Sequence, residues 1–206
     1  MISELEKKEI DQNTHANNLI NNLNLLQEYL DGLISKNETY RYNCFKVLFS
    51  VSEKKPDIIY PYWDFFINHL DSKNSYHKMS AVLILANLTA VDTEKKFETI
   101  FEKFYDNLKS EKTIVPIYVI KSSGKILKFK PNLEGKITDL LINIEKIHQG
   151  KQIELLKSAV IESFTEFFPN SKNKLEIINF VQEQIKSSSP KTRKIAKDFL
   201  KNFVGK

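Results

Sequence analysis

Few residues of this sequence combine the types and spacing that catalysis or metal binding requires. No two of the four histidines stand at a metal-ligand spacing, and the single cysteine, Cys44, cannot form a thiolate zinc site alone. The five glycines are scattered, so no glycine-rich phosphate loop exists. Glu162 and Glu166 lie one helical turn apart, as paired catalytic carboxylates can, but on an exposed helix this spacing is typical of solvated charge. The sequence therefore predicts a protein with no catalytic site, no metal and no cofactor.

Four polar residues occupy one position near the ends of regularly spaced helical segments. Each directly precedes an apolar residue that closes a helical face, and these apolar residues are Leu70, Leu108, Ile144 and Ile185. The polar residues are His69, Asn107, Asn143 and Gln184. An amide both donates and accepts hydrogen bonds, so a row of amides can hold an extended backbone. We expect either such a binding row or polar side chains that simply face water.

An unusually aromatic segment lies between residues 58 and 70. Its rings belong to Tyr60, Tyr62, Trp63, Phe65 and Phe66. This density exceeds what one helical face buries, which makes Tyr62 and Trp63 candidate anchors for a partner. Burial of the rings between neighbouring helices is the alternative.

Positive charge is concentrated in the second half of the chain. The net charge is +5; residues 1–100 hold 11 Lys/Arg and 14 Asp/Glu, whereas residues 101–206 hold 20 and 12. The basic residues of the last predicted helix and its lead-in are Lys186, Lys191, Arg193, Lys194, Lys197 and Lys201. Such a cluster can attract an anionic partner, although lysine-rich surfaces are also common on helical proteins.

The elements that position these residues are predicted to be helices. Apolar residues recur with the i, i+3, i+4, i+7 spacing of one helical face, and prolines and capping residues separate the segments. The expected helices cover residues 2–12, 14–35, 39–52, 58–70, 113–127, 133–147, 151–168, 174–186 and 190–203. Residues 76–108 add two more, with Asp92 or Thr93 as the cap of the second. No segment alternates as a strand.

A short pattern repeats along the chain. A small residue follows a basic residue by three positions and precedes a leucine by four, as in Arg41-x-x-Cys44-x-x-x-Leu48. The same pattern surrounds Ala81 and Ala196. Ala159 keeps the small residue without the flanking pattern, and the intervening copy has Ile120 there instead. The spacing from Cys44 to Ala81 is 37 residues, from Ala81 to Ala159 it is 78, and from Ala159 to Ala196 it is 37.

A helical-pair repeat of nearly forty residues with this pattern resembles the HEAT and armadillo families. The resemblance implies an all-α, right-handed α-solenoid of about five helical pairs in one domain over residues 1–206. Residues 1–13 would form an N-terminal capping helix and residues 187–206 a basic C-terminal capping helix. It also implies a concave face, lined by the second helices, that holds proteins or nucleic acid. In armadillo proteins, an asparagine ladder on comparable helices grips an extended peptide.

Two functions follow from this architecture. The favoured one is a non-enzymatic scaffold that binds an extended segment of another protein on its concave face. The alternative is a nucleic-acid-binding protein related to alkylation-repair DNA glycosylases, which also resemble HEAT arrays. Those enzymes need aromatic and acidic residues that converge in a basic groove, whereas Trp63 and Asp64 are adjacent and diverge by about 100° on a helix. Binding that weakens steeply with salt would favour the alternative.

Composition bounds the remaining classes. A hydrophobic share of 41% and a charged share of 28% are typical of a globular protein. No apolar run approaches the roughly 20 residues of a membrane span, so no membrane partner is expected. The charged start lacks an apolar signal core, and one cysteine fits a reducing compartment. We therefore expect a cytoplasmic protein.

Overall fold

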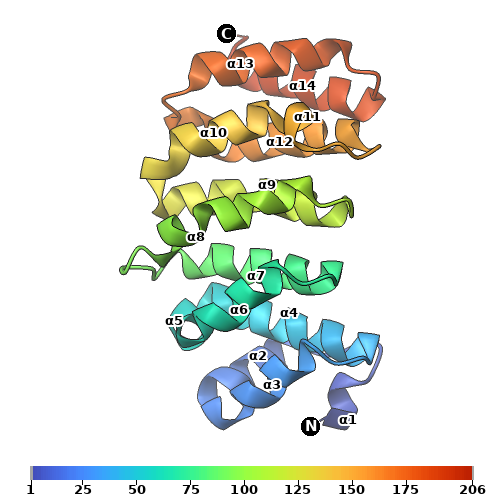
Figure 1. Cartoon of the computed structure of the whole chain (residues 1–206), viewed down its shortest axis with the longest axis vertical. Coiled ribbons are helices and arrows are strands. Elements are labelled where there is room, and N and C mark those ends of the chain that lie inside the picture. Colours follow the sequence, from blue (N-terminus) through green and yellow to red (C-terminus); the bar gives the residue numbers. More distant parts are fainter. Residues whose placement is uncertain (1, 206) are drawn as a thin grey trace. The chain divides into compact units, whose positions relative to one another are not determined.

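The computed structural model describes residues 2–205, and in this range the chain is helical without any strand (Figure 1). Helices account for 79% of the residues, which confirms the all-α prediction. The chain divides into two compact units, Met1–Ile100 and Phe101–Lys206, which are described separately below. The prediction of a single repeat domain over residues 1–206 stays a prediction; Met1 and Lys206 lie outside the described residues.

In the first unit, α4 and α7 form the centre of the core. The helices are α1 (Ile2–Leu5), α2 (Gln12–Asn21), α3 (Leu26–Gly32), α4 (Glu38–Lys54), α5 (Pro56–Ile59), α6 (Trp63–Leu70) and α7 (Ser75–Leu88), and α8 (Lys96–Tyr105) begins here. Helix α4 contacts α2, α3, α5 and α7, while α6 packs on α7. Leu48 and Val51 of α4 and Ile84 and Leu85 of α7 are fully buried. Removing such side chains from water supplies most of the stability of this unit.

In the second unit, α12 lies between α9 and α14 (Figure 1). The helices are α9 (Ile114–Phe129), α10 (Glu134–Ile142), α11 (Ile144–Ile147), α12 (Ile153–Phe167), α13 (Lys174–Glu183) and α14 (Pro190–Phe203). Helix α13 contacts both α10 and α14. Helix α9 is continuous through Ser122–Gly124; Ser123 is buried there, and its hydroxyl lies 3.1 Å from the Tyr105 hydroxyl.

The N-terminal segment differs from the prediction. Instead of one capping helix over residues 1–13, the short α1 ends at Leu5, and α2 starts after Asp11, whose carboxylate accepts a hydrogen bond from the Thr14 amide. The helix predicted over residues 14–35 breaks at Asn22, which has a φ of −139°. Asparagine favours such breaks because its side chain competes with the helical backbone for hydrogen bonds.

Two further predicted helices are interrupted. A 3-10 turn at Tyr60–Tyr62 separates α5 from α6, because Pro61 has no amide hydrogen to donate. Asn143, with φ −93° and ψ 16°, separates α10 from α11. By contrast, the predicted cap of α8 is confirmed: the two carboxylate oxygens of Asp92 accept hydrogen bonds from the amides of Lys96 and Phe97, at 2.8 and 2.9 Å.

A recurrent turn precedes three of the helices, and we call it the serine turn. A serine hydroxyl accepts a hydrogen bond from the amide two residues later, and that residue then caps the helix with its own side chain. The serine and capping residues are Ser35 with Asn37, Ser72 with Asn74, and Ser187 with Ser189.

The basic residue of the repeated pattern completes two of the serine turns. The guanidinium groups of Arg41 and Arg193 donate to the carbonyl oxygens of Ser35 and Ser187, at 2.8 and 2.7 Å, six residues before each arginine. The arginine therefore fastens the turn to the helix that follows it, which gives the repeated basic residue a structural reason.

The recurrent small residues lie in the core, as their type suggests. Cys44, Ala81 and Ala196 are fully buried, and Ala159 is 3% exposed. A Cβ placed on Gly32 of α3 would collide with the Cys44 sulfur, so these two residues mark a close approach of α3 to α4. Burial raises the pKa of the Cys44 thiol to about 12, so the thiol is neutral at physiological pH.

A polar network joins three segments of the second unit around Lys157 of α12. The Lys157 ammonium lies 2.8 Å from Glu145 and 3.3 Å from Glu154, and the Ser187 hydroxyl also donates to Glu154. Desolvation raises the pKa of Glu154, but the bonds from Ser187 and Lys157 outweigh it and hold the pKa below its ordinary value of 4.5.

This network should make stability depend on acid pH. Because the pKa of Glu154 is lower in the folded chain, its contribution is complete above about pH 4.5 and is lost as the pH falls through the folded-state pKa. We expect the difference in urea midpoint between the wild type and Glu154→Gln to shrink as the pH falls below 4.5. A difference that stays constant with pH would show that the Glu154 charge contributes nothing.

None of the helices among residues 2–205 is long and apolar enough to cross a membrane.

Candidate functional site

The four polar positions share one local geometry. His69 Nδ1, Asn107 Nδ2, Asn143 Nδ2 and Gln184 Nε2 each lie 2.7–3.3 Å from the carbonyl oxygen four residues earlier. In each case α6, α8, α10 or α13 ends or tightens into a 3-10 turn nearby, which leaves carbonyl groups without helical partners. These side chains therefore bind backbone carbonyl groups near the C-terminal ends of their own helices.

This local role limits what the polar positions offer to a partner. Asn107 and Gln184 are buried, at 5% and 7% exposure. The carbonyl oxygen of the Asn143 side chain accepts a hydrogen bond from Lys146, at 2.9 Å. Contact of His69, Asn107, Asn143 and Gln184 with a partner stays a prediction.

The two aromatic candidates also differ in exposure. Trp63 is 2% exposed, and its ring centroid lies 5.6 Å from that of Tyr60. Tyr62 is only partly buried. The Tyr60 hydroxyl donates to Asp92 at 2.8 Å and so links the turn before α6 to the cap of α8. Trp63 is thus a core residue of the first unit and is not available as an anchor.

The basic candidates lie on or just before α14. Lys186, Lys191, Lys194, Lys197 and Lys201 are exposed, whereas Arg193 is half-buried by its bonds to the serine turn. Lys191 lies 3.4 Å from Glu162 of α12, and Lys121 of α9 lies 3.6 Å from the same carboxylate. The acid pair Glu162 and Glu166 does not form a carboxylate dyad: Glu162 pairs with lysines, and Glu166 lies against Gly124, where burial raises its pKa.

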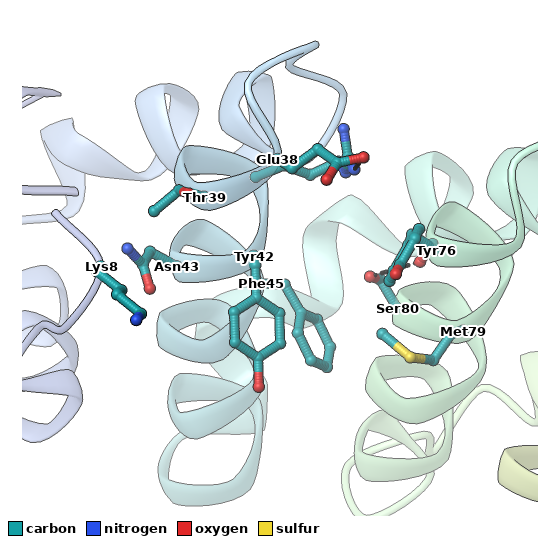
Figure 2. A pocket seen from close by; sticks show the side chains of 10 residues that line it. Lys8, Glu38, Thr39, Tyr42, Asn43, Phe45, Tyr76, Met79 and Ser80 are labelled. Atoms are coloured by element: carbon teal, nitrogen blue, oxygen red, sulfur yellow. Dashed lines mark hydrogen bonds and ion pairs between the residues drawn. The ribbon is translucent and has the colours of Figure 1, made fainter. Parts of the chain in front are cut away.

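The first unit contains a groove between α4 and α7 that the sequence did not reveal, and we call it the α4–α7 groove. Its cavity volume is about 410 Å³, within the usual range of ligand pockets. Figure 2 shows Tyr42 and Phe45 of α4 across from Met79 and Ser80 of α7. The lining residues are Lys8, Glu38, Thr39, Arg41, Tyr42, Asn43, Phe45, Tyr76, Met79 and Ser80.

The groove has an apolar floor and an aromatic rim. Phe45 and Met79 are 9% and 7% exposed, whereas Tyr42 and Tyr76 are 54% and 53% exposed. Both rings therefore keep apolar area in contact with water beside the hollow. The groove therefore offers an apolar surface that a partner could cover.

Both rim tyrosines, Tyr42 and Tyr76, make cation–π contacts with basic side chains. The Arg41 guanidinium lies 5.4 Å from the centre of the Tyr76 ring, and the Lys46 ammonium lies 4.9 Å from that of Tyr42. Glu38, the acid of the lining, pairs with Arg41 at 3.8 Å, which leaves Lys8, exposed at the opposite wall, and Lys46 as the excess positive charges. The charge around the groove is therefore positive and complements a carboxylate.

Hydrogen bonds hold the walls of the groove. The Asn43 amide donates to the carbonyl oxygens of Leu5 and Lys7, at 2.8 and 2.9 Å, and so fixes the segment that carries Lys8. Arg41 is fixed by Ser35, and its side chain is only 12% exposed. The groove is therefore built before any partner arrives, which lowers the entropic cost of binding.

The sequence did not indicate this groove because its two walls come from different helices, α4 and α7, that are far apart in the chain. Tyr42 follows the basic residue of the repeated pattern and Tyr76 precedes the next one by two positions. The available signal was a large aromatic residue shortly before each of two buried small residues: Tyr42 before Cys44, and Tyr76 before Ala81. Among residues 2–205, no three His, Cys, Asp or Glu residues converge in a way that could hold a metal ion.

Comparisons of the chain with protein-family models, with curated proteins and with solved structures found no match.

Proposed function

We propose that this protein is a non-enzymatic scaffold that binds an extended segment of another protein. Its helical repeats would stack as a right-handed α-solenoid of about five pairs. The recurrence of the serine turn in both units, at the same distance before a buried small residue, supports this repeat arrangement.

The α4–α7 groove carries the proposal about binding. Tyr and Arg are the residue types that dominate binding energy at protein interfaces, and here Tyr42, Tyr76 and Arg41 surround an apolar floor. A partner side chain in the groove would cover Phe45 and Met79, and the half-exposed rings would close around it. The basic rim favours an apolar residue next to an aspartate or glutamate in the partner segment.

The test is a pull-down from the native host with the wild type and the double variant Tyr42→Ala with Tyr76→Ala. Loss of both rings should weaken binding of the captured partner at least about tenfold, because hot-spot truncations cost about 2 kcal/mol or more. The melting temperature should change little, since both rings are half exposed. Binding to an identified partner would be quantified by calorimetry.

A matched control removes similar apolar area elsewhere in the first unit. Leu23 and Ile34 are 53% and 52% exposed and do not line the groove. Leu23→Ala with Ile34→Ala should leave partner binding intact. If both double variants bind as the wild type does, or if both fail equally, the groove is not the binding site.

A further inference from the structure

The surface of the second unit carries lysines on α9 and α14, the two helices that pack on either side of α12. Helix α12 contacts both α9 and α14, and its Glu162 pairs with Lys121 of α9 and Lys191 of α14, at 3.6 and 3.4 Å. These ion pairs show that the three helices turn these side chains toward the same side. Lys121 and Lys191 thus share the single negative charge of Glu162.

The lysines further along α14 differ from these two. Helix α14 buries Thr192, Ala196 and Phe199 against the unit, which leaves the opposite face to solvent. That face carries Lys194, Lys197 and Lys201, all exposed; we call these three the α14 lysine face. Within residues 2–205 none of the three forms an ion pair. Asp198 is the acid of this helix.

The spacing of the α14 lysine face suits a regularly charged chain. Positions 194, 197 and 201 follow the i, i+3, i+7 spacing of one helical side, so at 1.5 Å per residue the first and last cations are about 10 Å apart along the axis. A nucleic-acid duplex carries a phosphate charge for about every 1.7 Å of its length, so three flexible ammonium groups over this distance can each reach a phosphate.

We infer that the α14 lysine face binds the phosphate backbone of nucleic acid without reading its sequence. Lysine is a point charge on a flexible stem, which suits phosphate contact. The face carries no arginine for bidentate contact with guanine, since Arg193 is held by Ser187 and Ser188. Release of counterions from the phosphates supplies the driving force.

Two other anionic surfaces fit less well. An amphipathic helix that binds a membrane surface inserts its apolar face, but the apolar face of α14 is buried in the unit, so only its charge is available to lipids. A protein partner requires apolar anchors at the centre of its contact, and the α14 lysine face has none among its exposed residues. A phosphate backbone requires charge alone.

The experiment measures binding of a fluorescent duplex of about 20 base pairs and arbitrary sequence by anisotropy, between about 50 and 200 mM salt. The triple variant Lys194→Gln, Lys197→Gln, Lys201→Gln should weaken binding at least about tenfold. The slope of the logarithm of the association constant against log salt, which is negative, should become shallower by about 2–3. Asp198→Asn removes the acid of the helix and should tighten binding. Glutamine resembles lysine in helix propensity, so the fold is retained.

The control triple removes the same charge from the first unit. Lys36, Lys55 and Lys73 are exposed there, and their replacement by glutamine should change neither the affinity nor the salt slope. Equal losses in both triple variants would overturn the inference, because binding would then follow net charge alone. Binding to phosphatidylserine vesicles without binding to the duplex would also overturn it. The double variant Tyr42→Ala with Tyr76→Ala should bind the duplex as the wild type does, which separates this inference from the groove.

Discussion

Replacing Trp63 with alanine is expected to lower the free energy of unfolding by about 3–5 kcal/mol, a large share of the 5–15 kcal/mol typical of a folded domain. Trp63 is 2% exposed, and no smaller side chain can fill the space of its indole ring. Urea unfolding followed by circular dichroism measures the loss. A variant as stable as the wild type would mean that the ring faces solvent.

A second substitution at the same position separates volume from hydrogen bonding. The indole N–H of Trp63 is buried and has no hydrogen-bond partner among the described residues. Trp63→Phe removes this unsatisfied donor while it keeps most of the apolar volume, so its cost should stay below about 1.5 kcal/mol. If phenylalanine costs as much as alanine, the indole N–H makes a stabilising bond. In either variant the folded protein should retain the α4–α7 groove.

The second large effect is expected where α3 meets α4. A Cβ on Gly32 would overlap the Cys44 sulfur and come within 3.2 Å of the Tyr40 ring, so Gly32→Ala should destabilise the protein by about 1–3 kcal/mol through overpacking. Cys44→Ala alone should cost about 1 kcal/mol, because it leaves a small cavity.

The double variant tests whether the two positions share one space. Removing the sulfur makes room for the new methyl group, so Gly32→Ala with Cys44→Ala should cost less than the sum of the single variants, with a coupling of about 0.5–3 kcal/mol. Gly135→Ala is the control, since a Cβ there meets no atom within 4 Å and should be neutral or stabilising. Additive costs would show that Gly32 and Cys44 are independent.

Features set by neighbouring residues could be predicted from the sequence. The Asp92 cap and the Pro190 helix start depend on side chains within five residues of the amides they serve, and the structure confirms both. The burial of Ala81 and Ala196 follows from helical periodicity. Such signals are local, so one sequence contains them in full.

The errors have physical causes of a different kind. Asn22, Pro61 and Asn143 interrupt apolar periodicity that continues past them, because the core needs the apolar face while the local backbone leaves the helix. Apolar periodicity indicates which side chains face the core, but it does not indicate where the backbone leaves the helix. The density of aromatic residues around Trp63 does not indicate which of the rings are buried by neighbouring helices.

The α4–α7 groove could not be predicted from the sequence, for a third reason. Tyr42 and Tyr76 belong to different helices, and their exposure depends on how α4 and α7 pack. No pattern within one helix reports a hollow between two. The role of Arg41, which fixes a turn and lies against the Tyr76 ring, likewise depends on how the chain folds around it.

The serine turn has an evolutionary consequence. From Ser187 to Leu200, the hydrogen bonds of the turn, its cap and its arginine are satisfied within fourteen consecutive residues, and the same arrangement runs from Ser35 to Leu48. A segment that forms these helix-starting hydrogen bonds internally can be copied by in-frame duplication and still start a helix at its new place. In a duplicated segment of this kind, the surrounding apolar residues are free to diverge while the turn continues to start a helix.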